Sequence, residues 1–387
     1  MREQLSADFE RFRRGLPRDF PAHVRETYGI NLAARYLGHP LPHPIGKGSG
    51  QLSLNADQLE ADRAAGVAFV VLKTVIAETA AGERSMGAWA VRESRMAVER
   101  RRTGDRQGWT VTWKGRGWDR SMEDYLGLVR AGRDLTRAGA KGLLVVPSVK
   151  YHLPRLGEAF SDAEYSHTTA RLARAWGRSE LPLEKDFSPT LAGDPLADER
   201  TQVLRWITEI PARIRQAAPH GARVQLKLMN SRFDDDFQVE MLAASRDADG
   251  ATVFNRLFDS TRGVAYGGWE LSDRNLRVLD LARARWMPRP GLTGTGNVCS
   301  GRVLVEYARR GCESVQLHTF FQLPLGQYPA TAGSRSARAL HALLFDPRDG
   351  LIAVMLELEE QGTLHRRAGE LNFLDLACGS TEQSFTS

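Results

Sequence analysis

The stretch LEKDFSPTLAG, Leu183–Gly193, begins as a short apolar strand and ends in a loop. Three polar side chains, Lys185, Asp186 and Ser188, stand at the end of that strand, and Pro189 terminates it. Polar groups at the mouth of an apolar strand are costly to order unless they have a partner or a task. The stretch therefore predicts a functional strand end, whose role depends on what the other strands carry at the same end.

Short apolar runs alternate with amphipathic stretches such as ADQLEADRAAG and SGRVLVEYARRG along the chain. This alternation is the pattern of βα units around a parallel sheet. The eight strand candidates are 44–50, 68–75, 142–149, 181–189, 224–229, 251–258, 291–298 and 314–321. Eight strands with crossover helices predict a (β/α)8 TIM barrel, an α/β fold whose active site lies at the C-terminal ends of the strands.

The predicted barrel spans residues 44–362 and follows an N-terminal extension, residues 1–43, with a helix near 5–15. Within it, residues 76–121 are a long insertion over the C-terminal face, and 321–335 form a second long loop there. Residues 363–387 are a C-terminal tail that we expect to be partly disordered, because its last residues are polar.

Composition narrows the class of protein. The net charge of +6 is scattered along helices without a compact basic run, so no nucleic-acid partner is expected. No apolar run reaches 18 residues, and the N-terminal segment is too charged for a signal peptide or a membrane anchor. The three cysteines, Cys299, Cys312 and Cys378, form no CxxC pair, which argues against a disulfide framework and a metal centre. A cytoplasmic protein is expected.

Lysine is rare in this chain, since only seven of the 53 basic residues are lysines. Lysine suits a compact positive charge in a confined site, whereas arginine serves most surface positions here. The lysines at or near the ends of the first five predicted strands are Lys47, Lys73, Lys150, Lys185 and Lys227. Their placement predicts a site for an anionic ligand, and the alternative is that they only extend along the barrel rim.

A glycine-rich turn, GTGNVCSG at 294–301, opens a predicted helix with Ser300 at its N-cap. Backbone N–H groups at such a turn and at a helix N-terminus attract anions. Thr319 on the neighbouring strand completes a predicted phosphate site, in the position after strands seven and eight where barrels often bind phosphate.

The order of these motifs resembles the dihydroorotate dehydrogenase family of FMN-dependent (β/α)8 barrels. The resemblance covers roughly residues 40–340 and rests on IGKGSG, VVLKTV, EKDFSPTLAG, VQLKLM, VFNRLF, YGGWELS and GTGNVCSG with GCESVQLHT. It implies that Ser188 is a catalytic acid or base, and that Lys227 is catalytic beside the flavin. The implied FMN-binding residues are Ser49, Gly50, Lys73, Thr74, Lys227, Asn255, Gly268, Gly296, Asn297, His318 and Thr319.

The sequence departs from the family in its substrate residues. Lys185 and Thr190 stand where the family has two asparagines, and Trp113 or Lys114 replaces a loop asparagine. Of the family's substrate set only Asn255 is retained. A site that loses these amide contacts selects another ligand. The implied activity is therefore an FMN-dependent oxidoreductase acting on a C–C bond next to a carbonyl, in a small anionic substrate other than orotate.

The residues leave alternatives open. A flavin-free, phosphate-binding barrel could act as a lyase or isomerase through Lys185 or Lys227, and a barrel that only binds a ligand is a third reading. The sequence identifies no metal, no electron donor or acceptor and no oligomeric state, and it leaves a homodimer open.

Overall fold

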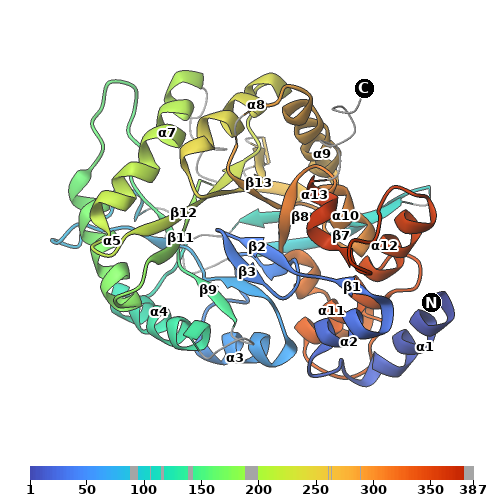
Figure 1. Ribbon diagram of the computed structural model, residues 1–387. Helices are drawn as coiled ribbons and strands as arrows, with labels where there is room; N and C mark the ends of the chain where they lie inside the picture. The colour runs from blue at the N-terminus through green and yellow to red at the C-terminus, as the bar shows by residue number, and fades with distance from the viewer. Residues whose placement is uncertain are drawn as a thin grey trace.

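A curled parallel sheet forms the centre of the protein in the computed structural model, which describes residues 1–87, 95–104, 106–114, 117–137, 143–187, 199–259, 261–262, 264–287 and 289–378 (Figure 1). Its strands are β4 (Ile45–Lys47), β5 (Phe69–Val71), β6 (Val75–Ile76), β9 (Leu144–Val146), β10 (Ser148–Lys150), β11 (Leu181–Asp186), β12 (Ala222–Met229), β13 (Gly250–Asn255), β16 (Gly291–Gly294) and β17 (Cys312–Leu317). Each of the eight predicted strand runs overlaps at least one of them.

The strand order is β6-β10-β11-β12-β13-β16-β17-β4-β5-β9, and every pairing within this sheet is parallel. The strands β11 and β17 are separated by three others, yet Gln316 of β17 donates a hydrogen bond to Glu184 of β11 at 2.7 Å. The sheet therefore curls around an interior in which side chains of distant strands meet. This supports an α/β architecture related to the predicted barrel.

The interior of the curled sheet is polar. Buried polar side chains recur at every second position of the strands, as in Glu184, Gln225, Thr252, Thr293, Ser314 and Gln316. They bond to one another: Gln225 donates to Thr252 at 3.0 Å, and the hydroxyls of Thr293 and Ser314 lie 3.0 Å apart. Apolar residues at the intervening positions, such as Leu183 and Leu226, face the helices instead.

Helices lie on the outside of the sheet (Figure 1). They are α3 (Ala56–Ala65), α4 (Met122–Arg137), α5 (Asp162–Trp176), α7 (Arg200–Ala217), α8 (Asp235–Ala244), α9 (Trp269–Ala284), α10 (Gly301–Ala308), α11 (Arg335–Phe345) and α12 (Leu351–Glu360). Several begin at a side chain that caps the first turn; Ser300, as predicted, accepts from the Val303 N–H at the start of α10. Among the described residues, no helix has the length and apolar character needed to cross a membrane.

The N-terminal extension holds more structure than the single predicted helix. It contains α1 (Arg2–Arg11), a 3-10 turn (Phe12–Arg14), α2 (Phe20–Tyr28), β1 (Ile30–Asn31) and the hairpin of β2 (Ala34–Tyr36) and β3 (His39–Leu41). The buried Asp8 joins the two helices, because His23 and the Tyr28 hydroxyl lie 2.7 and 2.8 Å from its carboxylate. The strand β1 pairs with β18 (Leu371–Asn372), which leads into α13 (Phe373–Cys378). The last nine residues of the predicted tail, 379–387, lie outside the described residues.

The long insertion at 76–121 contains a hairpin formed by β7 (Arg95–Thr103) and β8 (Arg106–Lys114). A second hairpin follows β13, formed by β14 (Leu257–Asp259) and β15 (Val264–Gly268). The strand β15 pairs with β8, so that the four strands form an antiparallel sheet in the order β14-β15-β8-β7. The sequence predicted the insertion, but not that a second hairpin joins it.

Candidate functional site

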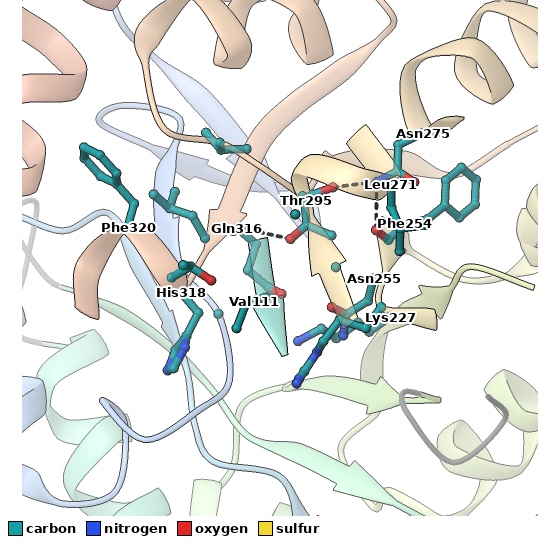
Figure 2. Close-up of a pocket in the computed structure, with 18 of the residues that line it drawn as sticks. Val111, Lys227, Phe254, Asn255, Leu271, Asn275, Thr295, Gln316, His318 and Phe320 are labelled. Atoms are coloured by element: carbon teal, nitrogen blue, oxygen red, sulfur yellow. Dashed lines mark hydrogen bonds between the residues drawn. The ribbon is translucent and has the colours of Figure 1, made fainter. Parts of the chain in front are cut away.

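A pocket lies at the carboxyl ends of β12, β13, β16 and β17, beneath β8 and β15 (Figure 2). Lys227 and Asn255 come from β12 and β13, whereas Thr295 and His318 directly follow β16 and β17. Val111 of β8 lines the opposite side. The pocket therefore lies at the edge where a parallel α/β sheet brings together the residues that follow its strands, as the sequence predicted.

Lys227 brings a positive charge to the pocket. Its ammonium group is almost fully buried and lies 3.8 Å from a carboxylate oxygen of Glu184 in the sheet interior. Asn255 ends β13 next to it, and its carbonyl oxygen accepts from the side chain of Asn230 at 2.6 Å. This hydrogen bond holds the backbone at the end of β13, where the Asn255 side chain lies near Lys227 (Figure 2).

Side chains from α9 and α10 hold the backbone of the glycine-rich turn after β16. Tyr307 donates to the carbonyl oxygens of Thr295 and Gly296 at 2.8 and 3.0 Å, and Asn275 donates to that of Thr295 at 3.1 Å. Because a trans peptide directs its N–H opposite to its carbonyl group, the N–H groups that follow these carbonyls face away from Tyr307. Gly296 has a φ of +108°, which glycine adopts without strain. The turn can thus offer N–H donors to an anion.

The antiparallel sheet β14-β15-β8-β7 is hydrogen-bonded to this turn through β8. The side-chain oxygen of Asn297 accepts from the Trp109 N–H of β8 at 3.0 Å. At Gly268, where φ is +89°, a Cβ would lie 2.2 Å from the Trp109 carbonyl oxygen. Asn297 and Gly268 therefore position β8 over the pocket, which is a structural role in addition to any contact with a ligand.

His318 and Gly50 form a close contact on the other side of the pocket. A Cβ at residue 50 would lie only 2.0 Å from the His318 Nε2 atom, so the imidazole occupies the space that glycine leaves. Burial, together with the positive charges of Arg256 and Lys73, lowers the pKa of His318 well below its usual value. The imidazole is therefore neutral at physiological pH and serves as a hydrogen-bonding group; its Nε2 lies 3.2 Å from the side-chain nitrogen of Gln322.

A chain of hydroxyl groups leads from the pocket to Asp186. Ser49 lines the pocket, and its oxygen lies 2.9 Å from that of Thr74. Thr74 donates to the Asp186 carboxylate at 3.1 Å, and Lys150 lies 3.3 Å from the same carboxylate. These residues connect the ends of four strands through polar side chains.

Positive charge is concentrated around Asp186. Burial, the charge of Arg256 and other nearby charges lower the pKa of Lys73 to about 7. Burial is also the main reason why the pKa of Arg256 is lowered to about 10. Bringing several cations together in a low-dielectric site raises the free energy of their charged forms. An anionic ligand bound here would restore the charge on Lys73.

The structure brings together most of the predicted FMN-binding residues. Those that line the pocket are Ser49, Lys227, Asn255, Gly268, Gly296, His318 and Thr319. Gly50, Thr74 and Asn297 contact the pocket-lining or covering residues as described above, and Lys73 lies within electrostatic range of Arg256. The roles of these residues stay predictions.

The predicted catalytic Ser188 and most of the predicted substrate-binding residues are described only in part or not at all. Ser188 and Thr190 lie outside the described residues, as do the side chains of Trp113 and Lys114. Lys185 is fully buried and outside the pocket lining; its ammonium group lies 4.8 Å from the centre of the Phe187 ring. Lys47 does not belong to an anion site, because it is paired with Asp62 of α3 and donates to Ser336 of α11 at 3.0 Å.

Sequence reasoning missed Glu184, Gln316, Asn275 and Arg256. A signal for Gln316 is present in the strand VQL, where it stands between two apolar residues, whereas Glu184 in LEKD has an apolar neighbour, Leu183, on one side only. Such alternation marks a strand with one polar and one apolar face, and here the polar face is the interior. Asn275 lies on α9 and Arg256 follows β13, and neither has a local pattern that indicates a site.

No protein-family model matches the chain, and no curated protein matches it at a significant level. The pocket itself therefore carries the functional argument. Its residues can bind an anion at the turn before α10 and can place a cation and neutral hydrogen-bonding groups around a small planar ligand.

Proposed function

We propose that this protein is an FMN-dependent oxidoreductase, similar to dihydroorotate dehydrogenases, acting on a C–C bond next to a carbonyl in a small anionic substrate other than orotate. One observation carries the proposal: Lys227 and the turn before α10 line the same pocket. A flavin mononucleotide has a ring that accepts negative charge on reduction and a phosphate at the other end of its chain. The pocket offers a cation for the first and N–H donors for the second.

In this proposal the curled sheet is an eight-stranded barrel. The strands β5 and β6 are two parts of the second barrel strand, and β9 and β10 are two parts of the third. The pairings support this division, because β5 pairs with β4 and β9 while β10 pairs with β6 and β11. With β17 also paired to β4, each of the eight composite strands has a neighbour on both sides.

The residues fit FMN in chemistry. The turn at Gly296 and the N-terminus of α10 would hold the phosphate, and Lys227 would lie beside the ring. When bound, the flavin supplies hydride transfer at its N5 atom. The pocket volume, about 90 Å³, is small for a flavin, so the proposal requires rotamer changes in lining side chains on binding.

The chain's own residues would bind the substrate and move its proton. Lys73, Arg256 and Lys150 surround Asp186 near the pocket and would attract an anionic group. Ser188, two residues beyond Asp186, is the proposed proton donor or acceptor. A serine hydroxyl needs a neighbouring group to take up its proton at neutral pH, and Lys73, with a pKa of about 7, is suited to that task.

An absorbance spectrum of the purified protein tests the proposal. Flavin bands, with FMN identified by mass after denaturation, would support it. A colourless protein that takes up no added FMN would overturn it. The Ser188→Ala variant then separates flavin binding from catalysis. It should keep the flavin spectrum and lose turnover of any substrate found by screening.

A second candidate function is lysine-based carbonyl chemistry without flavin. One observation favours it: burial, with the nearby charge of Lys150, lowers the pKa of Lys185 to about 7. A lysine with a pKa near 7 is partly deprotonated at neutral pH, and its neutral amine can form a Schiff base with a carbonyl substrate. Borohydride trapping of a phosphorylated aldehyde or ketone on Lys185, absent in Lys185→Arg, would favour this function over the flavin proposal.

A further inference from the structure

Glu184 is a fully buried carboxylate in the sheet interior, and the proposed function gives it no role. It lies on β11 below the pocket, on the strand that leads to Ser188. Burial raises the pKa of this carboxyl group, and the nearby Lys227 opposes that rise. A buried carboxyl group needs hydrogen-bonding or charged partners, and two of the partners of Glu184 line the pocket.

Four side chains contact the Glu184 carboxylate. The hydroxyl groups of Tyr36 and Ser148 donate to it at 3.4 and 3.3 Å. Gln316 donates its side-chain amide to Oε2 at 2.7 Å, and the Lys227 ammonium lies 3.8 Å from Oε1. Gln316 and Lys227 both line the pocket, so one carboxylate holds two ligand-facing groups.

The contact with Glu184 decides which end of the Gln316 amide remains for a ligand. Because the side-chain NH2 of Gln316 donates to Glu184, the carbonyl end of the amide is the end left for a ligand. The side-chain carbonyl oxygen of Gln316, Oε1, is buried and has no hydrogen-bond partner among the described residues. It lies beside Gly48, where a Cβ would approach it to 3.3 Å. A buried acceptor in a pocket is satisfied by a ligand N–H group.

The geometry points to a specific ligand edge. Lys227 offers a positive charge for a carbonyl oxygen or a developing anion, and Gln316 offers an acceptor for an adjacent N–H. We propose that Glu184 is a positioning residue that fixes this pair to recognise a ring with neighbouring carbonyl and N–H groups, a cyclic imide or ureide. This inference rests on the proposed function, because the first ligand considered is the flavin ring. The flavin ring carries such an edge at its N3 atom.

The test compares the affinities of FMN and of its N3-methyl derivative, which lacks the N–H. The wild-type protein should bind FMN more tightly than the methylated form by roughly tenfold or more, because only FMN satisfies the Gln316 oxygen. Glu184→Gln should abolish this discrimination, since an amide can turn either end toward Gln316. Glu184→Asp should restore part of it, which a loss of packing alone would not explain.

Gln316→Leu provides a second test of the role of the Gln316 oxygen if the Glu184 variants fail to fold. It removes the acceptor and should bring the two affinities together. Gln225→Leu is its matched control, because Gln225 is an equally buried glutamine of the interior that does not line the pocket. Gln225→Leu should discriminate as the wild type does.

The outcomes separate the two proposals. FMN binding without discrimination, or discrimination unchanged in Glu184→Gln and Gln316→Leu, would overturn the role of Glu184 and leave the proposed function standing. If neither flavin binds, the proposed function fails, and uracil against 1,3-dimethyluracil becomes the probe pair. Uracil binding that depends on Glu184 and Gln316 would then support the inference with a substrate ring as the ligand, and its absence would overturn the inference.

Discussion

Lys47 and Lys227 both lie near the carboxyl ends of parallel strands, on β4 and β12, and both are almost fully buried. Their surroundings differ. Lys47 points to the helices, where Asp62 and Ser336 bind its ammonium group. Lys227 points to the sheet interior and lines the pocket, and its ammonium group lies 3.8 Å from a carboxylate oxygen of Glu184.

The comparison shows that the face of the strand decides what a buried lysine does. On the helix-facing side the charge of Lys47 is compensated by a close buried carboxylate, that of Asp62. On the interior side the counter-charge is more distant, and the cation remains able to interact with a ligand. The following predictions test this division.

The largest effect is expected on folding, at the helix-facing lysine. Lys47→Met leaves Asp62 buried without its cation and should lower the free energy of unfolding by about 3–5 kcal/mol. Denaturant unfolding measures it. The double variant Lys47→Met with Asp62→Leu should regain most of the loss, and a double variant as unstable as the single one would show that the pair is not the cause.

Replacing the interior lysine should affect the ligand instead. Lys227→Met removes the cation beside the proposed flavin ring and should weaken binding of the reduced ring, relative to the oxidised one, by about 1.5–3 kcal/mol. A redox titration would record this as a more negative midpoint potential. Lys47→Met is the matched control and should leave the potential unchanged; equal shifts in both variants would contradict the division.

A smaller effect is expected at the contact between Gly50 and His318. Gly50→Ala places a methyl group 2.0 Å from the imidazole and should cost about 1–3 kcal/mol of stability while displacing His318 from the pocket wall. Gly326→Ala is the control, because a Cβ there meets nothing within 4 Å. A Gly50→Ala protein with wild-type stability and FMN affinity would show that His318 has room to move.

The smallest effect per pH unit is the pH dependence caused by Lys73, whose pKa falls from an ordinary 10.5 to about 7 in the folded protein. Between these two pH values the unfolded chain holds a proton on this lysine that the folded protein has lost. Stability should therefore rise with pH across this window, by at most about 1.4 kcal/mol per pH unit from this group. Lys73→Met should reduce that slope, and an unchanged slope would place the lysine in a more hydrated site.

Much of the sheet could be predicted from the sequence, because each strand is a short apolar run between helical stretches. The face to which Lys47, Lys185 and Lys227 point was also readable. Lys227 follows Gln225 by two residues, whereas Lys47 follows Ile45 and Lys185 stands between Leu183 and Phe187. Since alternate residues share a face, a polar neighbour at this spacing indicates the interior and an apolar one indicates the helices.

Other features could not be predicted from local patterns. The pairing of β15 with β8 joins segments about 150 residues apart, and no local propensity specifies such a contact. The meeting of Glu184 with Gln316 likewise depends on how far the whole sheet curls. Asn275 supports the turn before α10 from a different helix, so its role emerges only in three dimensions.

The central claim is that the pocket at the carboxyl edge of the sheet binds FMN. A crystal structure of the protein with added FMN tests it most directly. The account predicts a flavin ring against Lys227 and Gln316, with its phosphate at the turn before α10. A flavin bound elsewhere, or a pocket that stays without flavin at saturating FMN, would contradict it.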